Sequence, residues 1–123
     1  MALLLNVGCS ETKYIEPEQI GTNKLPAYYS ITTTKSSSSG LDCVLRELSL
    51  SDSRNTFEHA INGNDWTIDI VYGKNGIVGG GQIGKIVGDG KSITFYYRPA
   101  IGNFGMDAWN VEKVVPSSLK TCA

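Results

Sequence analysis

Apolar and polar residues alternate along the middle of the chain, between residues 66 and 98, as they do in half-buried β-strands. Every second residue of WTIDIVY (66–72) is apolar or aromatic, and so is every second residue of ITFYY (93–97). Between them, a strand over 77–87 is interrupted by glycines, which are typical of a bulge or a close backbone approach. The region therefore predicts three neighbouring strands.

Four dipeptides that favour tight turns divide this region evenly. They lie at 62–63, 75–76, 89–90 and 102–103, at intervals of 13, 14 and 13 residues. Asn-Gly and Asp-Gly tolerate the positive φ angles that two-residue hairpin turns require. These intervals leave room for a strand but not for a helix between turns, so they indicate an antiparallel meander.

The segment 41–50 has a different apolar spacing. Its residues Leu41, Val44, Leu45 and Leu48 lie at i, i+3, i+4 and i+7. This spacing predicts one face of a short helix, with a strand as the alternative. We expect Ser39 to cap the helix and residues 35–40, KSSSSG, to form a loop.

Three further segments complete the prediction. Residues 28–34, YYSITTT, are rich in aromatic and β-branched types and favour a strand. Residues 56–61 alternate as a strand does, with a helix as the alternative. Residues 107–115 are predicted to form the last strand, with Trp109, Val111 and Val115 on one side. The predicted fold class is mainly β (β-rich α+β), with about six or seven antiparallel strands in a small barrel or curved sheet and one short helix near 41–50.

Length and composition predict one β-rich domain over 28–123, preceded by a polar lead-in or tether over 1–27. The 123 residues are 41% hydrophobic and 19% charged, which is typical of a single globular domain. The net charge is −1 and no basic run occurs, so we expect no binding to nucleic acid.

The chain has three cysteines, Cys9, Cys43 and Cys122. A cysteine next to the last residue is rarely needed for packing, so we expect a disulfide between Cys43 and Cys122. In the chain-entropy model a loop of this length contributes about 4–5 kcal/mol. The alternative is three reduced thiols in a cytosolic protein.

The start of the chain, MALLLNVGC, resembles the end of a bacterial lipoprotein signal, in which an apolar run leads to a small residue and the cysteine that is lipidated. Gly8 and Cys9 fit this pattern, whereas Asn6 departs from it. The resemblance implies a lipid anchor at Cys9, and with it a periplasmic, outer-envelope or secreted location. The alternatives are an N-terminal β-strand and a cytoplasmic location.

Two short segments resemble loops of chagasin-type cysteine-protease inhibitors, which have an immunoglobulin-like fold. GGGQ at 79–82 is similar to their G-x-G-G loop, and RPA at 98–100 is similar to R-P-aromatic. The third loop, N-P-T-T-G, does not occur in this sequence. The resemblance implies an inhibitor of a cysteine protease.

The sequence contains no complete motif for catalysis, cofactor binding or metal binding. The glycines at 79, 81 and 84 have the spacing of a dinucleotide-binding loop, but the helix that this loop requires is replaced by a strand and turn. A lone histidine and no closely spaced cysteine pair argue against zinc. We expect no cofactor and no metal. A small enzyme working through Asp52, His59 or Asp107 is the third functional hypothesis.

Aromatic and arginine side chains, of the kind enriched at binding hot spots, gather between 96 and 109. The predicted binding residues are Gly80, Gly81, Tyr96, Arg98, Asn103, Phe104 and Trp109. The leading hypothesis is a small non-enzymatic binding module of the bacterial envelope or exterior, which engages a protein or small ligand through the loops 79–84 and 98–105. The alternative is a cytosolic immunity or inhibitor protein that plugs a toxin or enzyme.

Overall fold

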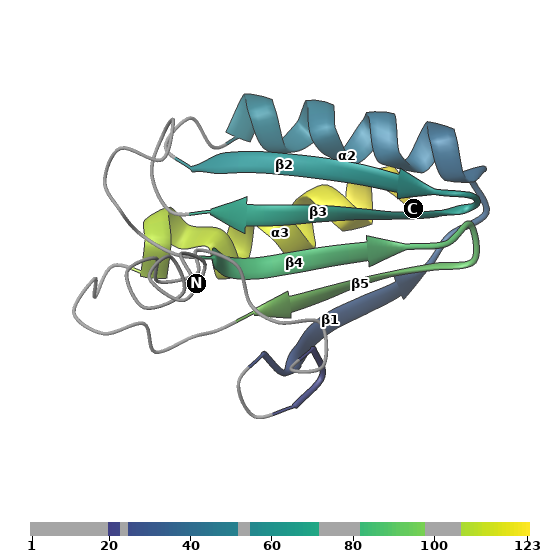
Figure 1. Cartoon of the computed structure of the whole chain (residues 1–123). Coiled ribbons are helices and arrows are strands. Elements are labelled where there is room, and N and C mark those ends of the chain that lie inside the picture. Colours follow the sequence, from purple (N-terminus) through teal and green to yellow (C-terminus); the bar gives the residue numbers. More distant parts are fainter. Residues whose placement is uncertain (1–19, 23–24, 52–54, 72–81, 98–106) are drawn as a thin grey trace, which may run out of the picture.

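The computed structural model of the chain describes residues 20–22, 25–51, 55–71, 82–97 and 107–123, with side chains from 111 onward in the last range. Figure 1 shows its elements. In chain order they are β1 (Ala27–Thr32), α2 (Ser37–Ser51), β2 (Thr56–Asn62), β3 (Asp65–Val71), β4 (Gln82–Gly88), β5 (Ser92–Tyr97) and α3 (Asp107–Cys122).

The strands form one open sheet in the order β1-β5-β4-β3-β2, and every neighbouring pair is antiparallel. Strands β2 to β5 follow one another as a meander, and β1 is added beside β5. The predicted β-rich α+β fold and its central meander are thus confirmed. The described residues give five strands in one open sheet, where the sequence suggested six or seven and a small barrel as one possibility. Chagasin-type inhibitors have an immunoglobulin-like fold, which consists of two packed sheets. The described residues of this chain form a single sheet.

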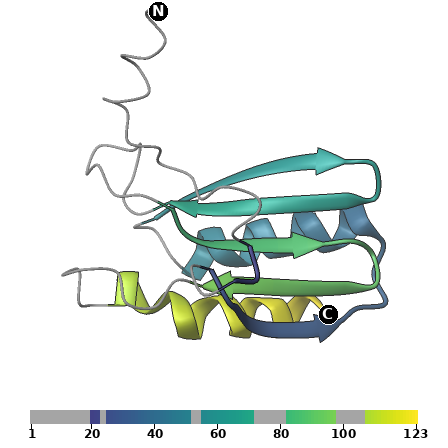
Figure 2. The same ribbon diagram turned by 60° about the horizontal axis from the view of Figure 1, so that its bottom comes forward.

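Both helices cover the same face of the sheet and contact each other (Figure 2). The core lies between the two layers, because every second residue of the inner strands points toward the helices. It contains Leu41, Val44 and Leu48 of α2, Trp66, Ile68 and Ile70 of β3, Ile83 and Ile86 of β4, Ile93, Phe95 and Tyr97 of β5, and Val111, Val115, Leu119 and Cys122 of α3. Neither helix is long and apolar enough to cross a membrane.

Two of the predicted turns lie within the described residues. Gly63 and Gly90 have φ angles of 67° and 85°, in the region that favours glycine. The first turn is one residue later than predicted, because Asn62 still pairs with Asp65 and the loop is Gly63 and Asn64. The predicted turns at 75–76 and 102–103 lie outside the described residues.

The carboxylate of Asp89 organises the second turn. Its Oδ1 accepts hydrogen bonds from the main-chain N–H groups of Ser92 and Lys91, both at 2.9 Å. These bonds, with that from Ser92 the larger effect, hold the pKa of Asp89 below its ordinary value of 3.8 because they favour the charged form.

Helix α2 confirms the helical interpretation of 41–50, but it begins earlier than predicted. Residues Ser37 to Gly40 form its first turn and not a loop. Ser36, and not Ser39, supplies the cap, since its Oγ accepts the N–H of Ser39 at 3.3 Å. The apolar face of this helix is what fixes it on the sheet, because Leu41, Val44 and Leu48 are buried.

The prediction of a strand over 107–115 is wrong, because these residues begin helix α3. The buried residues Val111, Val115, Leu119 and Cys122 recur at helical spacing and lie against the core. Pro116 lies inside the helix without ending it. Burial of this face outweighs the local preferences of the valines and the proline.

Candidate binding surface

The loops predicted to bind are attached to the same end of the sheet. β3 ends at Val71 and β4 begins at Gln82, and these two residues pair across the strands. β5 ends at Tyr97, whose register partner on β4 is Gly84. The segments that follow β3 and β5 therefore start at the same end of the sheet, on either side of β4 and opposite the turns at Gly63 and Gly90 (Figure 1).

Among the predicted binding residues, the structure describes the side chain of Tyr96. It is half-buried on β5, on the sheet face that the helices leave open. Trp109 belongs to α3, and its side chain is outside the described part of the chain. The other five lie outside the described residues: Gly80, Gly81, Arg98, Asn103 and Phe104.

Tyr97 has the opposite role to Tyr96. Its ring is buried in the core, where it contacts the ring of Phe95 with centroids 5.5 Å apart. Its hydroxyl donates a hydrogen bond to Glu112 Oε1 of α3, at 3.2 Å. Tyr96 and Tyr97 thus lie on opposite faces of the sheet, as neighbouring residues of a strand do.

A polar cluster of Asp69, Gln82 and Lys85 lies beside Tyr96. Asp69 Oδ1 accepts hydrogen bonds from Lys85 Nζ at 2.9 Å and from Gln82 Nε2 at 2.8 Å. Gln82 Nε2 also donates to the carbonyl of Gly84 at 3.0 Å. Gln82 is only 2% exposed, whereas Asp69 and Lys85 keep part of their side chains in solvent.

The strand registers place Asp69 and Lys85 of this cluster in one row across the open face. Glu58 of β2 is opposite Asp69, Asp69 is opposite Lys85, and Lys85 is opposite Tyr96. Two carboxylates, an ammonium group and a phenol thus follow one another over four strands. Such a row offers an ion pair and an aromatic surface to a polar ligand or a protein.

Sequence reasoning did not single out Asp69, Gln82 or Lys85. The alternation correctly placed Asp69 on the face opposite Trp66 and Ile68, which are buried. What it lacked was the register, because a bulge near Ile83 shifts the pairing of β4 with β3. The predicted interruption of this strand was the one signal of that shift.

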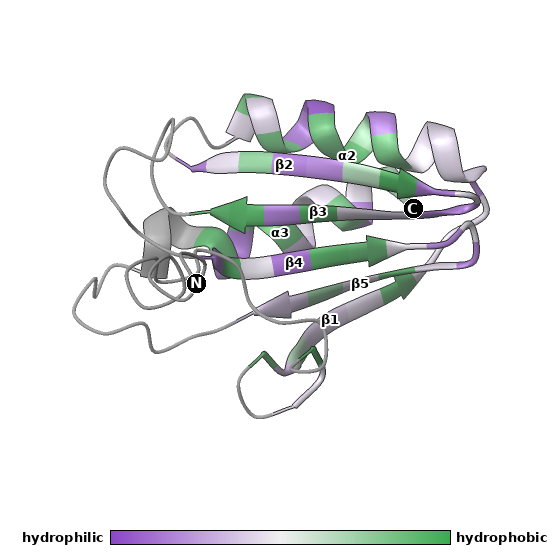
Figure 3. Ribbon diagram, viewed as in Figure 1, coloured by the Kyte–Doolittle hydropathy of each residue, from purple (hydrophilic) through white to green (hydrophobic). Residues whose placement is uncertain are grey.

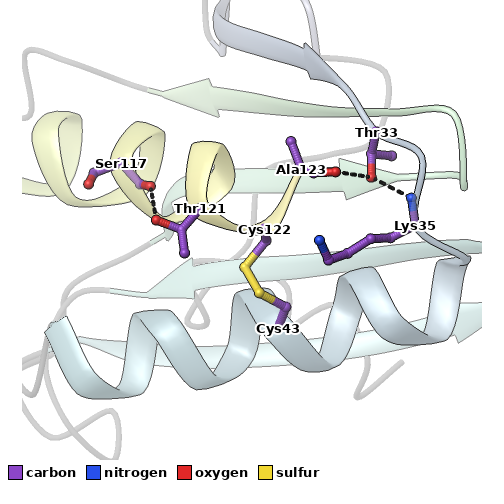
Figure 4. Close-up of a disulfide and its surroundings, with 7 residues drawn as sticks. All are labelled: Thr33, Lys35, Cys43, Ser117, Thr121, Cys122 and Ala123. Carbon is purple, nitrogen blue, oxygen red and sulfur yellow. Dashed lines mark hydrogen bonds between the residues drawn. A yellow bond between two sulfur atoms is a disulfide. The ribbon is translucent and has the colours of Figure 1, made fainter.

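The disulfide between Cys43 and Cys122 is present and joins α2 to α3 (Figure 4). Their Cα atoms are 5.7 Å apart, and both residues are buried. Next to it, Thr33 Oγ1 donates a hydrogen bond to the carbonyl of Ala123 at 3.3 Å. The C-terminal end of the chain is thereby held to α2 and to the segment after β1.

Of the three residues considered for catalysis, the structure describes the side chain of His59. His59 is exposed on β2, Asp52 lies outside the described residues, and Asp107 begins α3 with its side chain undescribed. Within the described ranges, no group of three or more histidine, cysteine, aspartate or glutamate side chains could hold a metal ion. Cys9 also lies outside these ranges.

Comparison of the chain with protein-family models, curated proteins and solved structures finds no match.

Proposed function

We propose that this protein is a non-enzymatic binding module of the bacterial envelope or exterior. It engages a protein or small ligand through the loops 79–84 and 98–105. The observation that carries this proposal is that both loops leave the sheet at one end, next to the half-buried Tyr96. Two loops on one rigid scaffold can bind a single ligand together.

The disulfide supports a location outside the cytosol. Disulfides persist in oxidising compartments and are rare in the cytosol, where thiols are kept reduced. The pair Cys43 and Cys122 closes a sequence separation of 79 residues. A lipid anchor at Cys9 would attach the domain to the envelope, with residues 10–27 as the tether. The disulfide also favours this location over that of a cytosolic immunity protein.

The polar row on the open face extends the binding surface. Lys85 Nζ contacts Asp69, and an ammonium group has two further N–H donors that a ligand can use. The neighbouring ring of Tyr96 offers apolar area with a hydroxyl at its tip. We therefore expect a ligand with both a hydrogen-bond acceptor and an apolar part.

The test is a pull-down from envelope extract of the source bacterium, with the immobilised protein as bait and mass spectrometry as the readout. A component retained by the wild-type protein should be retained at least tenfold less by Arg98→Ala and by Phe104→Ala. Retention that is unchanged in both variants contradicts the site.

The matched controls are exposed residues outside the two loops. Lys91→Ala removes an exposed cation at the opposite end of the sheet, and Leu50→Ala removes an apolar side chain that is 76% exposed on α2. Both controls should retain the component as the wild type does. Equal loss in the controls and the site variants would mean that binding does not depend on these loops.

A further inference from the structure

The outer side of β2 is an open sheet edge in the described part of the chain. β2 is last in the strand order, and its register with β3 runs through seven consecutive pairs without a shift. In Figures 1 and 2, no described strand lies along its other side.

The outward main-chain groups of β2 follow from its turn. Asn62 and Asp65 close a two-residue loop, so this pair is hydrogen-bonded, and bonded and unbonded pairs then alternate along the strand. The N–H and C=O groups of Phe57, His59 and Ile61 therefore point away from β3. They can form a ladder with another strand.

β2 lacks three of the features by which edge strands avoid pairing with other chains. It has no proline, no lysine and no bulge, and five of its seven residues are exposed. The opposite edge strand β1 follows Pro26 and has a register shift between Ala27 and Tyr29. The β1 edge of the sheet thus has a proline and a bulge, whereas the β2 edge has neither.

The sequence of β2, TFEHAIN, is complementary to itself in antiparallel pairing. The register that pairs all seven residues puts His59 opposite His59 of a second copy. Phe57 then faces Ile61 of that copy, which is a favourable aromatic and β-branched pair. Glu58 faces Ala60, so the carboxylates do not meet. A register shifted by two residues pairs fewer residues, and in one direction it sets Glu58 against itself.

Exposed apolar surface gathers at the same edge. Ile61 is 66% exposed, and the end of β2 that holds it is apolar in Figure 3. Ile61 also forms one wall of a hollow of about 240 Å³ between the start of α2 and the β2–β3 turn, with Leu41 and Trp66 among the other lining residues. A second copy placed against β2 would cover this side chain.

We propose that two copies of this chain pair through β2, antiparallel, about a two-fold axis at His59, so that the two sheets become one. A two-fold interface of this kind uses the same patch on both copies. The proposal does not depend on ligand binding by the loops 79–84 and 98–105, because the edge of β2 and those loops are different parts of the sheet.

Sedimentation equilibrium of the oxidised full chain, over a concentration series, tests the assembly. We expect a monomer–dimer equilibrium with a dimer of twice the chain mass. Ile61→Lys and His59→Lys set ammonium groups in the interface and should each weaken the dimer at least tenfold. Both positions are exposed, so the monomers should keep the wild-type circular dichroism spectrum.

Leu50→Lys is the matched control, since it makes the same change at an exposed apolar residue on α2. It should leave the dimer unchanged. A chain that is monomeric at every concentration contradicts the proposal. So does a dimer that is equally strong in the wild type and in both β2 variants.

A cysteine pair tests the register. Residues opposite each other in a hydrogen-bonded antiparallel pair have Cα atoms about 5.5 Å apart, which is within the span of a disulfide. In a Cys9→Ser background, His59→Cys should therefore form a dimer linked by an interchain disulfide. Ile61→Cys should not, because its two copies would be roughly 14 Å apart. Linkage of Ile61→Cys but not His59→Cys contradicts the proposed axis.

Discussion

The indole ring of Trp66 lies over Gly88, its register partner on the neighbouring strand β4. A Cβ atom added at Gly88 would overlap three atoms of that ring: Cζ2, Cε2 and Nε1. Trp66 is only 2% exposed and belongs to the core, so the ring has little space into which to move. Because Gly88 has no side chain, the indole ring of Trp66 can pack directly against its backbone.

Gly88→Ala should therefore destabilise the fold by about 1–3 kcal/mol, the usual cost of overpacking a core. The measurement is the free energy of unfolding from a urea titration. Gly40→Ala is the matched control, because its Cβ would lie 4.0 Å from Trp66 Cζ2, an ordinary contact. Since Gly40 is helical, this control should stabilise the protein by up to about 1 kcal/mol. Equal effects in the two variants would contradict this packing.

Reduction of the bond between Cys43 and Cys122 should lower the free energy of unfolding by about 4–5 kcal/mol in the chain-entropy model, because the bond closes most of the domain. Urea titrations with and without a reductant measure this difference. Cys43→Ala/Cys122→Ala should behave like the reduced protein, and Cys9→Ser should behave like the oxidised wild type. A reductant that leaves the titration unchanged while both thiols become free contradicts the prediction.

Asp69 should matter more for stability than Lys85, although they form one ion pair. Asp69→Ala removes the acceptor of two hydrogen bonds, one of them from the buried Gln82. Taking an acceptor from a buried donor costs about 1–3 kcal/mol. Lys85→Ala leaves the bond between Asp69 and Gln82 in place, so it should cost only about 0–1 kcal/mol. Thermal unfolding of the two variants decides the order, and a larger loss in Lys85→Ala would contradict it.

Asp89 should contribute a stabilisation that depends on pH. Its pKa is lower in the folded chain than its ordinary value of 3.8. A lowered pKa means that the contribution is fully present above pH 3.8 and is lost as the pH falls through the folded value. Asp89→Asn should thus be less stable than the wild type at pH 7, and the difference should shrink below about pH 3.8. Unfolding titrations at several pH values test this, and a constant difference contradicts it.

The sequence predicted the features of the fold that depend on local patterns. The alternation from Trp66 to Ile70 and the turns near Gly63 and Gly90 are local signals, and the strands they predict are present. The spacing of Leu41, Val44 and Leu48 predicted a helix for the same reason. The disulfide was expected from the unusual position of Cys122, next to the last residue, and it is present.

Features set by contacts between distant residues could not be predicted in this way. The place of β1 beside β5 depends on pairs such as Ile31 with Ile93. The helix at Asp107–Cys122 depends on burial of its apolar face against the sheet, and it forms although Pro116 lies inside it. The cluster of Asp69, Gln82 and Lys85 requires three positions to meet across two strands, which only the register determines.

The most direct test of the proposed envelope location is the intact mass of the full-length native gene product, with and without reduction before the thiols are alkylated. An envelope binding module should have Cys43 and Cys122 protected until reduction, together with the added mass of acyl chains at Cys9. Three freely alkylated thiols and no lipid would contradict this location and favour the cytosolic immunity or inhibitor protein.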